Sequence, residues 1–129
     1  MTARPPRQVR FVRAQFDTLA SGRCAAQVEL QGAAATYVGR AEGGCIDAEG
    51  PWAAARATAD ALHDLGHPVA IHGVEMVTVF GESAVAVQVT AQHEGNARRL
   101  VGFCLAADDA LRATVLAVLN ATNRFFEIG

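Results

Sequence analysis

Apolar and polar residues alternate along most of the chain in short runs, the pattern of β-strands with one buried face. Between Cys24 and Leu30, for example, every second residue is apolar. Glycine-containing turn segments separate the runs, as in antiparallel hairpins. The pattern predicts six strands, at Val9–Leu19, Cys24–Leu30, Ala35–Ala41, His67–Phe80, Ala84–Thr90 and Arg98–Leu105.

Strong helix-forming residues replace the alternation at Ala53–Leu65. Gly50 is an acceptable N-cap, and Pro51 suits the first helical position, where no amide hydrogen is needed. Gly66 and Pro68 then stop the helix, because proline cannot continue it. A first helix is therefore predicted between the third and fourth strands.

A second helix is predicted from Asp108-Asp109 to Phe126, with the aspartates at the positive end of the helix dipole. Its apolar residues cover more than one face, and a small domain has difficulty burying such a helix alone. We therefore expect a homodimer, with a thick monomeric core as the alternative. The apolar residues are Leu111, Val115, Leu116, Val118, Leu119 and Phe126.

The order strand, strand, strand, helix occurs twice, and the helix starts at Gly50 and Asp108 lie 58 residues apart. This repetition predicts a duplicated βββα unit. The fold class is α+β, with antiparallel sheets and helices packed on one face. We assign residues 1–13 to a basic arm or strand leader and 14–129 to one domain. Its units are 14–66 and 67–129.

Length and composition restrict the function classes. The 129 residues are too few for a (β/α)8 barrel, which needs about 200 or more. A net charge of −2 gives no electrostatic basis for binding nucleic acid. No stretch approaches the ~18 apolar residues that span a bilayer, and the N-terminus lacks the apolar region of a secretory signal. The expected location is the cytoplasm, without membrane association.

Candidate reactive groups are few. The three cysteines lack a C-x-x-C pair, so reduced thiols are expected rather than a disulfide framework or zinc site. His63 and His67 have metal-ligand spacing, but Gly66 interrupts the helix between them, which favours surface histidines. Cys45 lies near a helix start, where a thiol can be acidified. No catalytic residue, metal or cofactor is predicted.

The first helix start is the best candidate binding site. A Gly50-Pro51 start leaves the amides of Trp52, Ala53 and Ala54 directed outward, where they can bind a carboxylate or phosphate. The small alanine side chains permit close approach to the backbone. A purely structural turn is the alternative interpretation.

Several segments resemble the C-terminal regulatory domain of 2-isopropylmalate synthase. Gly50–Ala54 is similar to that family's G-P-[VIL]-[DA]-A loop, and Ser21-Gly22 precedes an alternating strand as in the family. His72–Val77 stands where the family has D-Y-x-E-H-A, and Gly81–Ala84 where it has G-x-D-A. Ala113–Arg124 resembles its final helix pattern, A-S-x-x-A-x-x-x-A-x-N-R. The similarity covers about residues 15–126.

The resemblance implies a dimeric, non-catalytic regulatory domain of two βββα units that binds L-leucine or a related amino acid near the dimer interface. It also implies action on a separate barrel-type synthase, since the catalytic barrel has no counterpart here. The implied ligand-binding residues are Gly50, Pro51, Trp52, Ala53, Ala54, His72, Gly73 and Val74.

Two alternatives remain open at this point. The family's tyrosine has no counterpart around Gly73 and Val74, and Trp52 is bulkier than the aliphatic residue of the family loop. Both differences favour a dimerisation scaffold whose pocket has closed. The other alternative is a small stand-alone enzyme that uses Cys45 or His72 as its reactive group.

Overall fold

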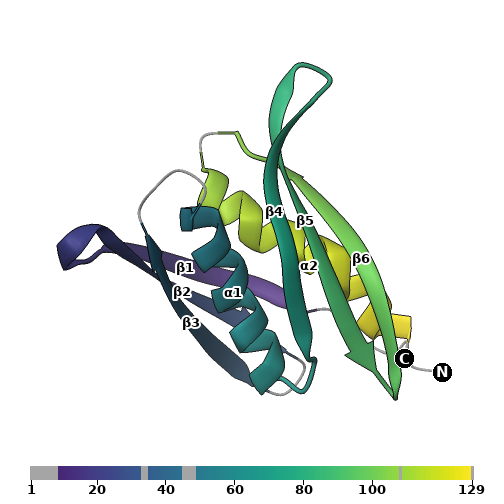
Figure 1. Ribbon diagram of the computed structural model, residues 1–129. Coiled ribbons are helices and arrows are strands. Elements are labelled where there is room, and N and C mark those ends of the chain that lie inside the picture. The colour runs from purple at the N-terminus through teal and green to yellow at the C-terminus, as the bar shows by residue number, and fades with distance from the viewer. Residues whose placement is uncertain (1–8, 33–34, 45–48, 108, 129) are drawn as a thin grey trace.

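The computed structural model describes residues 9–32, 35–44, 49–107 and 109–128, and it confirms the α+β class and the two βββα units (Figure 1). The first unit consists of β1 (Arg10–Thr18), β2 (Arg23–Gln31), β3 (Thr36–Gly44) and α1 (Glu49–Asp64). The second consists of β4 (Val69–Val79), β5 (Glu82–His93), β6 (Asn96–Leu105) and α2 (Ala110–Ile128). A single 3-10 turn, Ala20–Gly22, joins β1 to β2.

Each unit forms its own antiparallel sheet, called sheet A (β1-β2-β3) and sheet B (β4-β5-β6). The first strand of each sheet has a β-bulge at the same place in the repeat. Val12 interrupts the pairing of β1 with β2, and His72 interrupts that of β4 with β5. A bulge changes the direction of the side chains beside it, so its occurrence in both sheets is strong internal evidence of duplication.

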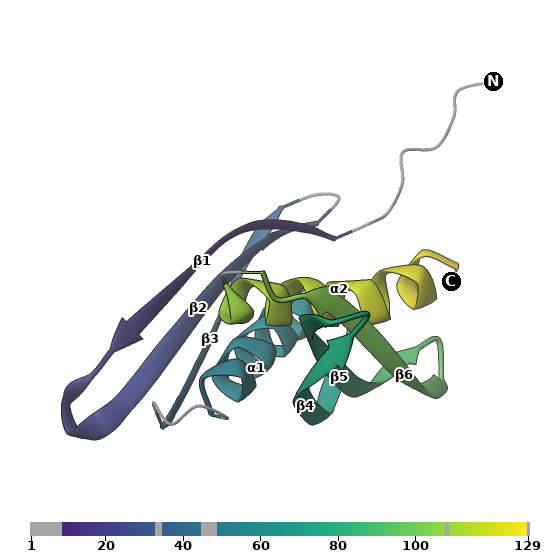
Figure 2. The same ribbon diagram turned by 90° about the horizontal axis from the view of Figure 1, so that it is seen from above.

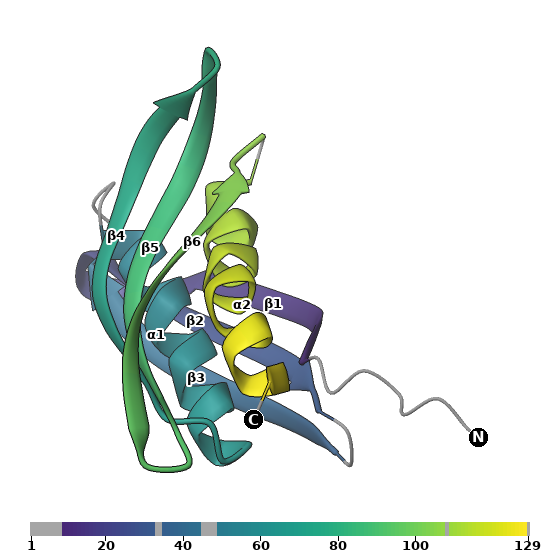
Figure 3. The same cartoon turned by 90° about the vertical axis from the view of Figure 1, so that its right-hand side faces the viewer.

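The two helices lie side by side between the two sheets (Figures 2 and 3). Helix α1 packs on β2 and β3 and also contacts β4, whereas α2 packs on β5 and β6 and also contacts β1. The buried side chains of both units belong to one hydrophobic cluster. The two units therefore share a core, and each helix is covered on more than one side by its own chain.

This arrangement removes the reason for which a dimer was expected, namely that one chain could not bury the apolar faces of α2. Val115 and Val118 of α2 are fully buried, and Leu119 is nearly so, within a single chain. The apolar faces of α2 need no second molecule, because sheet B, α1 and β1 cover them. Neither described helix combines the length and apolarity needed to cross a bilayer.

Each helix lies against its sheet at a glycine that a side chain would not fit. A Cβ atom at Gly39 of β3 would overlap backbone atoms of Ala57 and Ala61 in α1. A Cβ atom at Gly102 of β6 would overlap the carbonyl oxygen of Ala117 in α2. These contacts occupy corresponding places in the two units, so the same glycine–alanine packing is used twice.

The observed ends of the two helices agree only in part with the ends predicted from the sequence. Helix α1 begins at Glu49, so Gly50 lies inside the helix and is not its N-cap. At the other end, the amide of His67 donates to the carbonyl of Leu62 at 2.8 Å, which closes the last turn beyond Gly66. Asp109 caps α2 as expected, since its Oδ1 accepts a 2.9 Å hydrogen bond from the amide of Arg112. Asp108 lies outside the described residues.

Candidate functional site

The first turn of α1 is more enclosed than the sequence suggests. Pro51, Ala53 and Ala54 are buried, while Trp52 is half-buried with the Arg56 guanidinium 5.2 Å from its ring centroid. Because the helix begins at Glu49, the amides of Ala53 and Ala54 fall within the intrahelical hydrogen-bonding pattern. The amides that helix geometry leaves without an intrahelical partner in this turn are instead those of Glu49 and Gly50. An anion would have to approach one turn earlier than predicted.

The other predicted segment, His72, Gly73 and Val74, lies on β4 at its bulge. His72 is exposed, and its Nε2 lies 2.6 Å from Oγ1 of Thr90 on β5. Val74 pairs with Val87 and packs against the core. The bulge thus turns the imidazole outward while the next valine points inward.

A single chain does not bring the two predicted segments into one pocket. The helices lie on the inner face of sheet B (Figure 3). His72 and its partner Thr90 lie on the opposite, outer face. The sheet backbone therefore separates the His72 imidazole from the start of α1. Whether the eight residues bind a ligand stays a prediction.

The structure adds a histidine–phenylalanine cluster that the sequence did not reveal. The ring of His67 stacks on Phe126 with centroids 4.2 Å apart, and His93 meets Phe125 and Phe126 edge-on at 6.1 and 5.9 Å. Arg98 lies 6.0 Å from the Phe125 ring centroid. The expectation of surface histidines is correct for His63 and wrong for His67, which the end of α2 covers.

Burial lowers the pKa of His67 below its ordinary value of 6.5, and the nearby His93 lowers it further. The Gly66 backbone opposes this shift in part. The buried Nδ1 of His67 and Nε2 of His93 have no hydrogen-bond partner among the described residues. The His93 nitrogen is 3.9 Å from Glu94 Oε1, too far for a hydrogen bond. Protonation of His67 is therefore disfavoured in the folded state.

We expect the free energy of unfolding to fall as the pH drops below about 6.5, down to the lowered pKa of folded His67. In this window the unfolded chain takes up a proton that the folded chain resists, so acid favours unfolding. His67→Gln should flatten the pH dependence, as measured by urea denaturation between neutral and mildly acidic pH.

His63→Gln is the matched control, because His63 is exposed at the end of α1. Its pH profile should run parallel to that of the unmodified protein. An unchanged slope in His67→Gln would contradict the assignment, whatever that variant does to stability at neutral pH.

The remaining candidate groups are separate from these segments. Cys24 on β2 is disulfide-bonded, and Cys104 on β6 is a half-buried free thiol. The expectation of reduced thiols is therefore wrong for Cys24 and correct for Cys104, while Cys45 lies outside the described residues. Over the described ranges, no group of three or more His, Cys, Asp or Glu side chains is placed to hold a metal ion.

Comparison of the chain with protein-family models and with curated proteins gives no match. The likeness to the 2-isopropylmalate synthase regulatory domain consequently rests on the sequence motifs.

Proposed function

We propose that the protein is a non-catalytic regulatory domain that binds a small amino-acid-like effector at the first turn of α1. The observation that carries the proposal is the duplicated βββα plan, repeated down to the bulges at Val12 and His72. This is the plan that the motif resemblance implies. The first-turn amides of Glu49 and Gly50, which have no intrahelical partner in a helix that begins at Glu49, are suited to an effector carboxylate.

A helix terminus contributes only about 0.3–1 kcal/mol per charge, so contacts with the effector's side chain must supply most of the affinity. Trp52 is half-buried, and its indole offers an apolar surface beside the helix start. An aliphatic amino acid or the corresponding 2-oxo acid combines the carboxylate and the apolar group that such a site accepts. The domain would then report effector concentration to a separate barrel-type synthase.

A scaffold with a closed pocket is the second candidate, favoured by the complete burial of Ala54 and near-complete burial of Ala53. In that case Trp52 fills the space that an effector would occupy. The regulatory domain should bind an effector without any change to its sequence. The scaffold should bind one only after Trp52 is replaced with a smaller residue.

Isothermal titration calorimetry with leucine, isoleucine, valine and their 2-oxo acids tests the proposal. Binding of any of them by the unmodified protein supports the regulatory role. Binding by Trp52→Leu but not by the unmodified protein supports the scaffold. Phe80→Leu, which trims an entirely exposed aromatic side chain, is the control and should leave the titration unchanged. Absence of binding in every variant would exclude an effector role for these compounds.

A further inference from the structure

The hairpin of β4 and β5 projects beyond both helices (Figures 1 and 3). Its projecting part, residues 75–86, is called the distal hairpin below. Phe80 lies at the tip, and its side chain is 100% exposed, whereas no other large apolar side chain in the described part of the chain exceeds 53%. A single exposed apolar residue is ordinary on a protein surface, so exposure alone does not mark a function. It does show that the Phe80 ring adds nothing to the core of this chain.

The backbone of the turn does not favour phenylalanine either. Phe80 and Gly81 have φ values of 51° and 80°, the positive values of a type I′ turn. Asparagine, aspartate or glycine normally occupies the first position of such a turn, because a bulky residue is strained there. The next hairpin of sheet B has the same turn at Glu94 and Gly95, with φ values of 51° and 82°, and carries a charged residue at the first position. Phe80 thus opposes both solvation and backbone preference, and residues of this kind cluster at functional sites.

Apolar side chains continue from the tip along both faces of the hairpin. Val77 and Leu105 lie on the outer face of sheet B, on either side of Ala84, with which both pair. Met76 lies on the opposite face, since neighbouring residues of a strand point to opposite sides, and it is 51% exposed. Phenylalanine and methionine are enriched in protein–protein interfaces. The distal hairpin is therefore a convex apolar element with an aromatic ring at its end.

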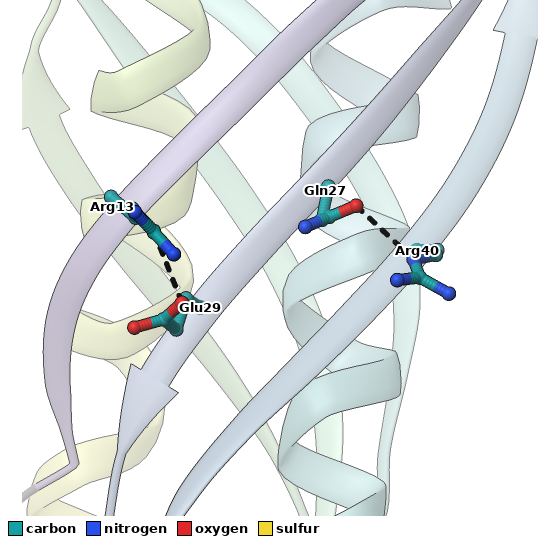
Figure 4. Close-up of polar contacts among 4 residues, drawn as sticks. All are labelled: Arg13, Gln27, Glu29 and Arg40. Atoms are coloured by element: carbon teal, nitrogen blue, oxygen red, sulfur yellow. Dashed lines mark hydrogen bonds and ion pairs between the residues drawn. The ribbon is translucent and has the colours of Figure 1, made fainter.

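The repeated backbone plan does not require this apolar surface, because sheet A lacks the same character. On its outer face Arg13 forms an ion pair with Glu29 at 3.1 Å, and Arg40 donates a 3.2 Å hydrogen bond to Gln27 (Figure 4). Cross-strand polar pairs of this kind are typical of a sheet face in contact with water. The corresponding connection of sheet A, the 3-10 turn Ala20–Gly22, consists of small residues. The apolar tip belongs to the second unit alone.

The charges of the distal hairpin indicate the chemistry of its partner. Glu75 and Glu82 are exposed on the same face as Val77, and residues 75–86 include no basic residue. Neither carboxylate forms an ion pair with another described residue. Basic groups would complement them, whereas an anionic membrane surface or the same hairpin of a second copy would repel them.

We propose that the distal hairpin docks into a different protein, with Phe80 entering an apolar pocket whose rim carries arginine or lysine side chains. Met76 and Val77 contact the pocket from the two faces of the hairpin, and the two glutamates pair with the rim. An aromatic anchor inside a polar rim is a common arrangement in protein interfaces. The docking does not depend on effector binding at α1.

The first test uses the isolated chain. Phe80→Asn should raise the urea midpoint, because asparagine accepts a positive φ more readily and no buried contact is lost. Glu94→Asn makes a change to the same residue at the same turn position of the next hairpin and should act in the same direction. A midpoint that falls only in Phe80→Asn would show that the ring stabilises this chain, and would overturn the proposal.

Photo-crosslinking in the cells that produce the protein tests the docking itself. Replacing Phe80 with p-benzoylphenylalanine should give a crosslink to one other protein, identified by mass spectrometry, whereas the same replacement of Glu94 should not. That protein, once purified, should bind the unmodified chain in calorimetry. Phe80→Asn should weaken this binding at least about tenfold, and Glu94→Asn should leave it unchanged. Glu75→Gln combined with Glu82→Gln should weaken it about threefold and reduce its salt dependence.

Other occupants of the tip give different results. A crosslink to lipid, or cosedimentation of the chain with vesicles of phosphatidylcholine and phosphatidylglycerol, would assign the tip to a membrane and overturn the proposal. A crosslink to a second copy of the chain, or no crosslink at position 80, would also overturn it. A docked protein that binds none of the amino acids or 2-oxo acids would exclude the proposed effector and leave this inference intact, and effector binding without a crosslink would do the reverse.

Discussion

Replacing Gly39 with alanine is expected to lower the free energy of unfolding by about 3 kcal/mol or more. The new methyl group would overlap the carbonyl oxygen of Ala57 and the amide nitrogen of Ala61. These are backbone atoms of α1, so no side-chain rotation can relieve the overlap and the helix must move off the sheet. Gly102→Ala should have a similar effect through Ala117 of α2. Urea denaturation followed by circular dichroism measures both changes.

Gly73→Ala is the matched control, since it also places a methyl group on a strand glycine. The nearest atom to the added Cβ there is the Cβ of Gln88 at 4.0 Å, an ordinary contact. The stability of this variant should stay within about 0.5 kcal/mol of the unmodified protein. If Gly39→Ala were equally stable, the close approach of α1 to β3 would be refuted.

Shortening Leu62 to alanine is expected to destabilise the protein by about 2–5 kcal/mol. Leu62 lies on α1, is fully buried and belongs to the hydrophobic cluster that both units share. The truncation removes apolar contacts and leaves a cavity in a core that both sheets enclose. Leu19→Ala makes the same chemical change at a side chain that is 38% exposed, and should cost less than about 1 kcal/mol.

The same variant tests whether the chain is one cooperative unit. Trp52 fluorescence reports on α1, because it is the sole tryptophan, and amide hydrogen exchange reports on α2. Both should show loss of structure at the same urea concentration in Leu62→Ala, since one core holds both helices. Protection of α2 that persists after α1 has unfolded would mean that the two units are separate domains.

Most of the element order was predictable because its causes are local. Alternation in Cys24–Leu30 identifies β2, and the aspartate at position 109 marks the start of α2 through its hydrogen bond to the first turn. Turn residues around Gly81 and Gly95 separate β4 from β5 and β5 from β6. The start of α1 was predicted within about two residues, which is the usual uncertainty of helix ends.

The candidate site was less predictable, because it depends on contacts between distant segments. The motif at Gly50–Ala54 identifies a helix start, but only the packed structure shows that Ala53 and Ala54 are enclosed. The neighbours of His67 come from β5 and from the end of α2, and its spacing from His63 contains no information about them.

The sequence by itself determined the strands, helices, turns and their repetition, since hydrophobic period, capping and turn chemistry act between near neighbours. Only the tertiary structure decided which face each element turns inward. On β6 the more apolar face, with Val101, Phe103 and Leu105, points outward, because α2 needs Gly102 on the inner side to approach the backbone. Which apolar surface is buried in the chain and which stays exposed follows from that packing.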